Sequence, residues 1–132
     1  MTAARRKFAP AFTTGEAPDQ LRERAWSVAA RVPDPAISSL TVVDLGVLRD
    51  IKIADGTLEV FVAAPDIGSP AMRVIALNIE EALEAAGFGL ARITPLRSPA
   101  WAPDWMSAKA RATLERAAAP AAIARRRTLL GQ

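Results

Sequence analysis

Two strand-like runs, Leu48-Arg49-Asp50-Ile51-Lys52-Ile53 and Leu58-Glu59-Val60-Phe61-Val62-Ala63, stand on either side of Ala54-Asp55-Gly56-Thr57. Both runs are rich in the branched and aromatic residues that favour extended backbone. Asp-Gly between such runs is a strong signal for a hairpin turn, because glycine readily adopts the positive φ that the turn requires. The stretch therefore predicts an antiparallel pair of strands.

Helical periodicity flanks this hairpin. On the N-terminal side, apolar residues recur at spacings of three and four, with Asp19 as the predicted N-cap and Pro33-Asp34-Pro35 as the end of the helix; they are Leu21, Ala25, Val28, Ala29 and Val32. Trp26 on this helix is expected to be buried.

A second helix is predicted after the hairpin, with Met72, Ile75, Ala76, Ile79, Leu83 and Ala86 on its apolar face. Ser69 suits its N-cap, Pro70 its first position and Gly87 its C-terminal end.

The remaining elements complete the prediction of the fold. Leu90 to Leu96 indicates a third strand, residues 97–106 form an aromatic loop, and Ser107 can cap a last helix that runs to about Ala119 before Pro120. This order predicts an α+β fold, a small α-β-β-α-β-α sandwich in which helices cover one face of a three-stranded sheet. The predicted organisation is a flexible basic arm over 1–17, the α+β domain over 18–118 and an Ala/Arg-rich tail over 119–132.

The composition limits the chemistry of the chain. Its 132 residues contain no cysteine and no histidine. Thiolate and imidazole are, with carboxylate, the usual protein ligands of transition metals, so a conventional iron–sulfur or zinc site is strongly disfavoured. The common nucleophile–base pairs also rely on histidine. We therefore predict no catalytic residues, no metal ligands and no cofactor bound by this chain alone.

Charge and hydropathy bear on partners and location. Residues 1–33 carry six Lys/Arg against three Asp/Glu, residues 34–100 five against nine, and residues 101–132 six against two. The positive charge thus lies toward the ends and not on the central domain, which argues against nucleic-acid binding. The run Arg125-Arg126-Arg127 is typical of a solvated tail. No apolar run approaches the roughly 20 residues that cross a bilayer, so a cytoplasmic protein without membrane contact is expected.

Several segments together resemble a known domain family; they are Ala25-Trp26-Ser27-Val28-Ala29, Val32-Pro33-Asp34-Pro35, Val43-Asp44-Leu45-Gly46-Val47-Leu48-Arg49-Asp50, Gly68-Ser69-Pro70-Ala71-Met72 and Pro99-Ala100-Trp101-Ala102-Pro103-Asp104-Trp105-Met106-Ser107. The family includes iron–sulfur assembly proteins of SufT type and the PaaD-type accessory proteins of bacterial phenylacetyl-CoA 1,2-epoxidase. The resemblance spans about residues 20–118, and the tryptophan segment resembles the PaaD branch. It implies a role in iron–sulfur cluster assembly or in phenylacetate degradation.

This sequence departs from the family pattern at two positions and at its C-terminal end. The family loop before the second helix typically reads Gly-Cys-Pro, where this chain has Ser69, and a threonine four residues earlier is replaced by Pro65. PaaD-type proteins also tend to continue into a cysteine-rich tail, where this chain has the Ala/Arg segment. The resemblance therefore implies a protein that docks to a partner, either subunits of a multicomponent oxygenase or iron–sulfur assembly proteins. The sequence leaves open whether the chain forms a homo-oligomer.

The resemblance implies seven motif or partner-binding positions: Asp44, Gly46, Gly68, Ser69, Trp101, Asp104 and Trp105. Structural interpretations compete with this role. Ser69 is favoured as a helix cap over a nucleophile, because no histidine can serve as its base. Asp44 and Asp50 suit side-chain bonding within a turn better than metal coordination. Trp101 and Trp105 can anchor a partner or pack against the sheet, and both alternatives stay open.

Overall fold

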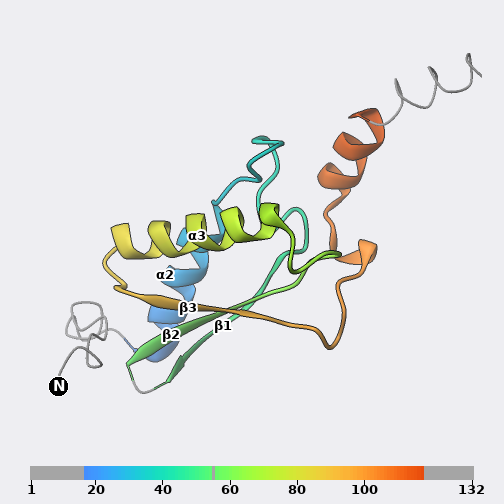
Figure 1. Ribbon diagram of the computed structural model, residues 1–132. Helices are drawn as coiled ribbons and strands as arrows, with labels where there is room; N and C mark the ends of the chain where they lie inside the picture. Colours follow the sequence, from blue (N-terminus) through green and yellow to red (C-terminus); the bar gives the residue numbers. More distant parts are fainter. Residues whose placement is uncertain (1–16, 55, 118–132) are drawn as a thin grey trace, which may run out of the picture.

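The computed structural model describes residues 17–54 and 56–117, and its elements follow the predicted order (Figure 1). They are α2 (Pro18–Ala30), β1 (Leu48–Ala54), β2 (Thr57–Val62), α3 (Pro70–Ala85), β3 (Ala91–Pro95) and a short 3-10 helix, η2 (Pro103–Trp105). A further helical segment covers 108–117. The predicted α+β class and the three-stranded sheet are confirmed. The predicted arm, the end of the last helix and the tail lie outside the described residues, apart from Ala17.

The sheet has the order β1-β2-β3 and is mixed. β1 and β2 are antiparallel, and Ala54 pairs with Thr57 across the two-residue turn, as the Asp-Gly signal predicts. β3 runs parallel to β2, with Val60 opposite Ile93. This parallel pairing requires a crossover connection, which α3 supplies. The sequence predicts the third strand but not its direction or its neighbour.

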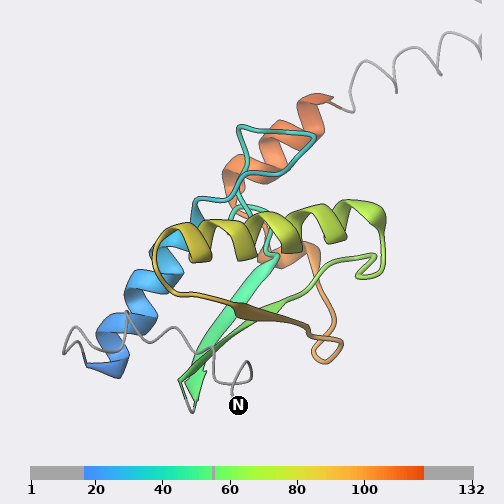
Figure 2. The same cartoon turned by 60° about the vertical axis from the view of Figure 1, so that its left-hand side comes forward.

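Both long helices lie against the same face of the sheet (Figures 1 and 2). α2 contacts β1 and α3, while α3 contacts β3. β2 alternates cleanly, so that Leu58, Val60 and Val62 are buried beneath the helices while Glu59 and Phe61 are only partly covered. The helices contribute buried stripes at helical spacing: Leu21, Ala25 and Ala29 from α2, and Met72, Ile75, Ile79 and Leu83 from α3. One apolar core therefore holds the layers together.

The helix ends agree with the sequence in two places and differ in one. Ser69 caps α3 by accepting a hydrogen bond from the backbone N–H of Met72 at 3.2 Å. Gly87 follows the end of α3 with φ of +94°, a conformation that favours glycine. The prediction of Asp19 as the cap of α2 is wrong, because Ala17 is the N-cap and Pro18 opens the helix. Proline needs no N–H partner there, so the helix begins earlier and Asp19 lies in its first turn.

The expected burial of Trp26 is only partly correct. Its side chain is half-buried and packs against the edge of the apolar core. The residues on the central buried stripe of α2, Ala25 and Ala29, are small, so the sheet approaches that stripe closely and the larger indole is placed to its side. The other part of Trp26 lines a surface hollow.

Arg22 ties α2 to strand β1. Its Nε donates a hydrogen bond to the backbone carbonyl of Ile51 at 2.7 Å, and its Nη2 lies 2.8 Å from an Asp50 carboxylate oxygen. The hydrogen bond from Arg22 holds the pKa of Asp50 below its ordinary value. Both side chains are exposed to solvent, so water and salt screen this ion pair and it contributes little to stability. Asp50 therefore has a structural partner in the fold.

Candidate functional site

Two segments far apart in the sequence meet at one end of the sheet. They are the turn Asp44-Leu45-Gly46 and residues 101–107, the tryptophan loop. The loop follows β3 and passes through η2 to the helical segment 108–117 (Figure 1). The backbone N–H of Ser107 donates to the carbonyl of Asp44 at 2.8 Å, so the two segments are joined through the main chain. Of the seven predicted site positions, this junction brings together Asp44, Gly46, Trp101 and Trp105.

Asp44 organises the junction. One carboxylate oxygen accepts hydrogen bonds from the backbone N–H and the hydroxyl of Thr41 at 3.0 and 3.2 Å. The other accepts from the Ser107 hydroxyl at 2.9 Å. The backbone bond from Thr41 is the largest cause that holds the pKa of Asp44 below its ordinary value, with smaller contributions from the Ser107 and Thr41 hydroxyls. The carboxylate is therefore engaged in holding the turn and is not placed as a general base.

Ser107 has a second role at the junction. Its hydroxyl oxygen accepts a hydrogen bond from the backbone N–H of Ala110 at 3.0 Å, which is the predicted capping interaction of the last helix. The same hydroxyl donates to Asp44, so the cap of this helix is fixed on the turn. The orientation of the helical segment 108–117 consequently depends on Asp44.

Gly46 makes the closest approach between the turn and the loop. It is buried, with φ of +73°. A Cβ atom built on Gly46 would lie 2.6 Å from Cβ of Trp105 and 2.8 Å from its carbonyl oxygen. The position therefore requires glycine for two reasons, the positive φ and the lack of space for a Cβ atom. This structural requirement accounts for glycine at position 46, and a role of Gly46 in partner binding stays a prediction.

The two tryptophans pack against the turn. The indole N–H of Trp101 donates to the carbonyl of Leu45 at 3.0 Å. The ring of Trp105 lies under the Arg49 guanidinium, whose central carbon is 3.7 Å from the ring centroid. Both rings remain half-exposed. The structure thus shows intramolecular packing, although against the turn and strand β1 and not against the face of the sheet, and leaves part of each ring on the surface.

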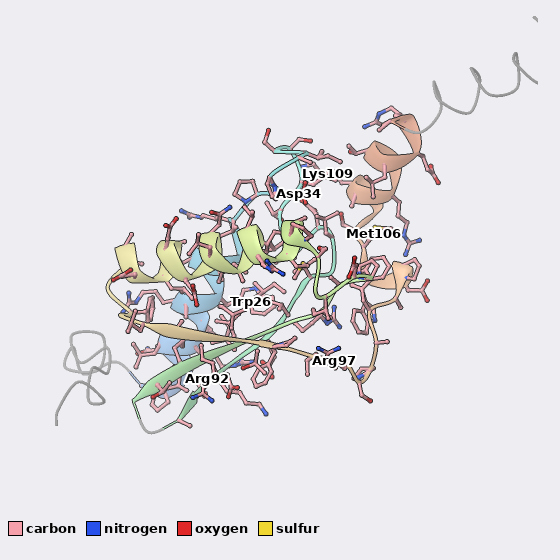
Figure 3. All side chains as sticks on the ribbon, in the orientation of Figure 1. Trp26, Asp34, Arg92, Arg97, Met106 and Lys109 are labelled. Carbon is pink, nitrogen blue, oxygen red and sulfur yellow. The ribbon has the colours of Figure 1, made fainter. Side chains whose placement is uncertain are left out.

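Ser69 and Trp101 line one cavity of about 310 Å³ beside the start of α3. Its lining is almost wholly apolar and includes Leu45, Val47, Met72, Ile75 and Met106. Met106 is labelled at the end of the tryptophan loop, and Asp34, labelled in the neighbouring loop, also borders the cavity (Figure 3). The Asp34 carboxylate accepts from the backbone N–H groups of Ala36 and Ile37, both at 2.8 Å. Its polarity is therefore largely satisfied within its own loop.

Two predicted positions lie outside this arrangement. Gly68 is exposed, and a Cβ added there would meet nothing within 4 Å. The exposed Asp104 contributes its backbone carbonyl, which accepts from Arg111 Nη2 at 3.3 Å. Their role in partner binding stays a prediction.

The residues present do not fit an iron–sulfur cluster. The chain has neither cysteine nor histidine. Over 17–54 and 56–117, no group of three or more Asp or Glu residues is arranged so that it could hold a metal ion. The hydroxyl of Ser69 is a poor ligand for iron–sulfur clusters. Within the same described residues, no helix has the length and apolar character to cross a membrane.

Replacing Ser69 with alanine is expected to lower the free energy of unfolding by about 1 kcal/mol, because α3 loses the side chain that accepts from Met72. Chemical denaturation followed by far-ultraviolet circular dichroism measures this change. The Ser69→Asp variant is the control and should retain most of the stability, since aspartate is also a good N-cap. Equal losses in both variants would contradict the capping role.

Sequence reasoning predicted that Ser107 caps the last helix, but it missed Thr41, the stacking of Arg49 on Trp105 and the hydrogen bond from Ser107 to Asp44. Thr41 and Asp44 have the spacing of a side-chain turn, and that signal was available locally. The stacking of Arg49 on Trp105 joins residues 56 positions apart, as does the bond between Trp101 and Leu45. No local pattern indicates such pairs, because they depend on where the chain returns after β3.

The chain is similar in sequence to proteins of iron–sulfur cluster assembly. The family model described as iron-sulfur cluster assembly protein matches residues 22–90. The chain is 34% identical over 99 residues to a putative 1,2-phenylacetyl-CoA epoxidase subunit of Escherichia coli (strain K12). This alignment covers 74% of the chain and 59% of the relative, so the chain spans less than two thirds of that protein.

Solved structures share the fold. A domain of unknown function from Bacillus anthracis superposes with a TM-score of 0.63 at 18% identity, covering 74% of this chain and 94% of that one. A conserved hypothetical protein from Thermotoga maritima gives a TM-score of 0.57 at 26% identity, covering 70% and 92%. These likenesses confirm the α+β architecture.

Proposed function

Since the chain belongs to the iron–sulfur cluster assembly protein family, we propose that it is a non-catalytic accessory protein that docks to a multicomponent oxygenase of the phenylacetyl-CoA epoxidase kind or to its maturation machinery. The 34% identity to a putative epoxidase subunit supports the proposed association with an oxygenase of this kind. The family membership supports an accessory or assembly role in general. The choice of the oxygenase as the docking partner is the part that needs an experiment.

The observation that carries the proposal is the apolar cavity beside Ser69. Its lining combines the start of α3, the Asp44-Leu45-Gly46 turn and the tryptophan loop, so the family motifs converge on one place. A volume of about 310 Å³ is sufficient to receive one or two apolar side chains of a partner. Trp101 is the aromatic residue in this lining and is half-exposed, and tryptophan is enriched among interface hot spots. These observations support our proposal that this cavity is the docking surface.

A second candidate function rests on the family match itself. As an assembly factor, the chain would help to deliver an iron–sulfur cluster that is cargo and whose ligands come from the partner. The chain's own residues would position the partner at the cavity, since they supply no thiolate or imidazole. The two candidates predict different iron contents in the complex, so they can be separated.

The test blocks the cavity without altering the buried core. Ala71 is an exposed residue on the first turn of α3 that lines the cavity, and Ala85 is an exposed residue at the last position of the same helix. Ala71→Trp is expected to reduce capture of purified epoxidase subunits at least tenfold, whereas Ala85→Trp should leave it unchanged. Biolayer interferometry with the immobilised chain measures both. Undiminished binding of Ala71→Trp would remove the cavity from the interface, and no binding by the unaltered chain would overturn docking to this oxygenase.

Iron analysis of the purified complex decides between the candidates. The accessory role predicts that the complex contains no more iron than the oxygenase subunits alone. The assembly role predicts additional iron and acid-labile sulfide that appear only when an assembly partner is present. The same measurement on the isolated chain provides the background value.

A further inference from the structure

A polar hollow lies between α2 and the start of β1. It has a volume of about 500 Å³ and is lined by Arg22, Glu23, Trp26, Ser27 and Arg49. Four of these residues come from α2 and the fifth from β1, so the hollow follows the seam between helix and sheet. Trp26 is labelled on α2 in Figure 3. The hollow does not share lining residues with the apolar cavity beside Ser69.

Arg49 is directed by a local irregularity of its strand. The pairing register between β1 and β2 shifts between Leu48 and Asp50, which leaves Arg49 as the extra residue of a β-bulge. Bulges change the direction in which a side chain leaves the strand. Here the guanidinium lies 3.7 Å from the ring centroid of Trp105, and the residue is half-buried. Stacking on a ring fixes the guanidinium plane and leaves its N–H groups at the edge free to donate.

The donors around this hollow outnumber its acceptors. Arg22 is engaged with Asp50 and the Ile51 carbonyl. Within 17–54 and 56–117, the guanidinium of Arg49 has no hydrogen bond or ion pair to any described group, and neither does the indole N–H of Trp26. Glu23 is the one carboxylate in the lining, and it lies beside Arg22 in the sequence. An oriented and unpaired guanidinium at a hollow with few acceptors favours an anion with planar, two-oxygen geometry.

We propose that Arg49, stacked on Trp105, is a binding site for a carboxylate side chain of the protein partner. This inference rests on the proposed docking function and adds the chemistry of a second contact. Trp101 lines the apolar cavity, and Trp105 of the same loop lies under Arg49, which lines the polar hollow. A partner seated on this loop can therefore contact both the cavity and Arg49. The apolar cavity takes an apolar side chain, and Arg49 takes an acidic one.

The first test uses a defined probe and needs no partner protein. The full chain, labelled with nitrogen-15, is titrated with N-acetylated tetraglutamate, and the side-chain N–H signals of Arg49, Trp26 and Trp105 are followed. The expected result is a saturable shift of the Arg49 and Trp105 signals, with the signals of Arg92 on β3 unchanged. Absence of a saturable shift at millimolar peptide, or equal shifts at Arg92, would overturn the site. A larger response to inorganic phosphate at equal concentration would overturn the assignment to a protein carboxylate.

The second test uses matched variants in the epoxidase binding assay. Arg49→Gln is expected to weaken binding about tenfold or more, while Arg92→Gln, which removes the same charge from β3, should change it less than twofold. Arg49→Lys should remain weakened, because lysine keeps the charge but lacks the planar fork. Full binding by Arg49→Lys or Arg49→Gln would overturn the inference and leave the docking function intact. Absence of binding by the unaltered chain would instead reject the docking function, and the peptide titration would still decide on the site.

Discussion

Replacing Gly46 with alanine is expected to lower the free energy of unfolding by about 2 to 5 kcal/mol. A non-glycine residue at its φ of +73° costs about 1 to 2 kcal/mol. The added Cβ would also lie 2.6 Å from Cβ of Trp105, with backbone atoms of the same residue within 2.9 Å. Forcing an atom into such a contact typically costs a further 1 to 3 kcal/mol, roughly, or displaces the loop. Urea denaturation followed by tryptophan fluorescence reports both the stability and the environment of the loop.

Alanine substitutions at two other glycines separate the cost of the backbone conformation from the cost of the close contact with Trp105. Gly87 has φ of +94° but open space around its Cα, so Gly87→Ala should cost only the backbone part, about 1 kcal/mol. Gly68 has neither the unusual φ nor a neighbour within 4 Å, so Gly68→Ala should stay within roughly 0.5 kcal/mol of the unaltered protein. If Gly46→Ala lowers the free energy of unfolding no more than Gly87→Ala does, the close contact with Trp105 does not contribute to the loss.

Replacing Asp44 with alanine is expected to lower the free energy of unfolding at pH 7 by about 2 to 4 kcal/mol. The carboxylate accepts two hydrogen bonds from Thr41 and one from Ser107, and bonds to a charged acceptor contribute about 1.5 to 3 kcal/mol each when well buried. Asp44 is half-exposed, so water can satisfy part of the freed donors in the variant and the expected loss is smaller than the sum of the three bonds. A double-mutant cycle with Ser107→Ala isolates the bond between turn and loop, and additive losses would contradict that bond.

The stabilisation by Asp44 should also depend on pH in a defined direction. Its pKa lies below the ordinary value of 3.8, so the folded protein favours the charged carboxylate more than the unfolded chain does. The contribution is complete above the unfolded value and is lost as pH falls through the lower folded value. The difference in stability between the unaltered protein and Asp44→Ala should therefore shrink between about pH 5 and pH 2. A constant difference across that range would contradict the assignment of the lowered pKa to these hydrogen bonds.

Gly46→Ala and Asp44→Ala both affect the contact between the Asp44-Leu45-Gly46 turn and the tryptophan loop. Gly46 permits the close approach of the tryptophan loop, and Asp44 ties the end of that loop to the turn. Both residues therefore contribute to the shape of the cavity through the position of Trp101 and Met106. A folded variant with a displaced loop should lose partner binding even though no contact residue has been changed. Measuring stability and binding on the same variants separates loss of the site from loss of the fold.

The local structure was determined by the sequence itself. The Asp-Gly turn places β1 against β2, and Ser69, Pro70 and Gly87 define the ends of α3. These features depend on backbone preferences of a few adjacent residues, so the pattern of side chains is sufficient to predict them. The absence of cysteine and histidine likewise sets the available metal ligands before any folding occurs. The start of α2 was misplaced because Pro18 suits the first helical position and Asp19 suits the N-cap, and the two assignments exclude each other.

The tertiary structure alone decided how the distant motifs meet. The parallel pairing of β3, the docking of the tryptophan loop on the Asp44-Leu45-Gly46 turn and the stacking of Arg49 on Trp105 all join residues more than 30 positions apart. Their energies depend on packing and hydrogen bonds that form only when the crossover through α3 has fixed the direction of the returning chain. Sequence patterns record local preference and burial, and they carry no direct signal for such pairs. The candidate site is therefore made of recognisable motifs, but their arrangement into one cavity and one anion site belongs to the fold.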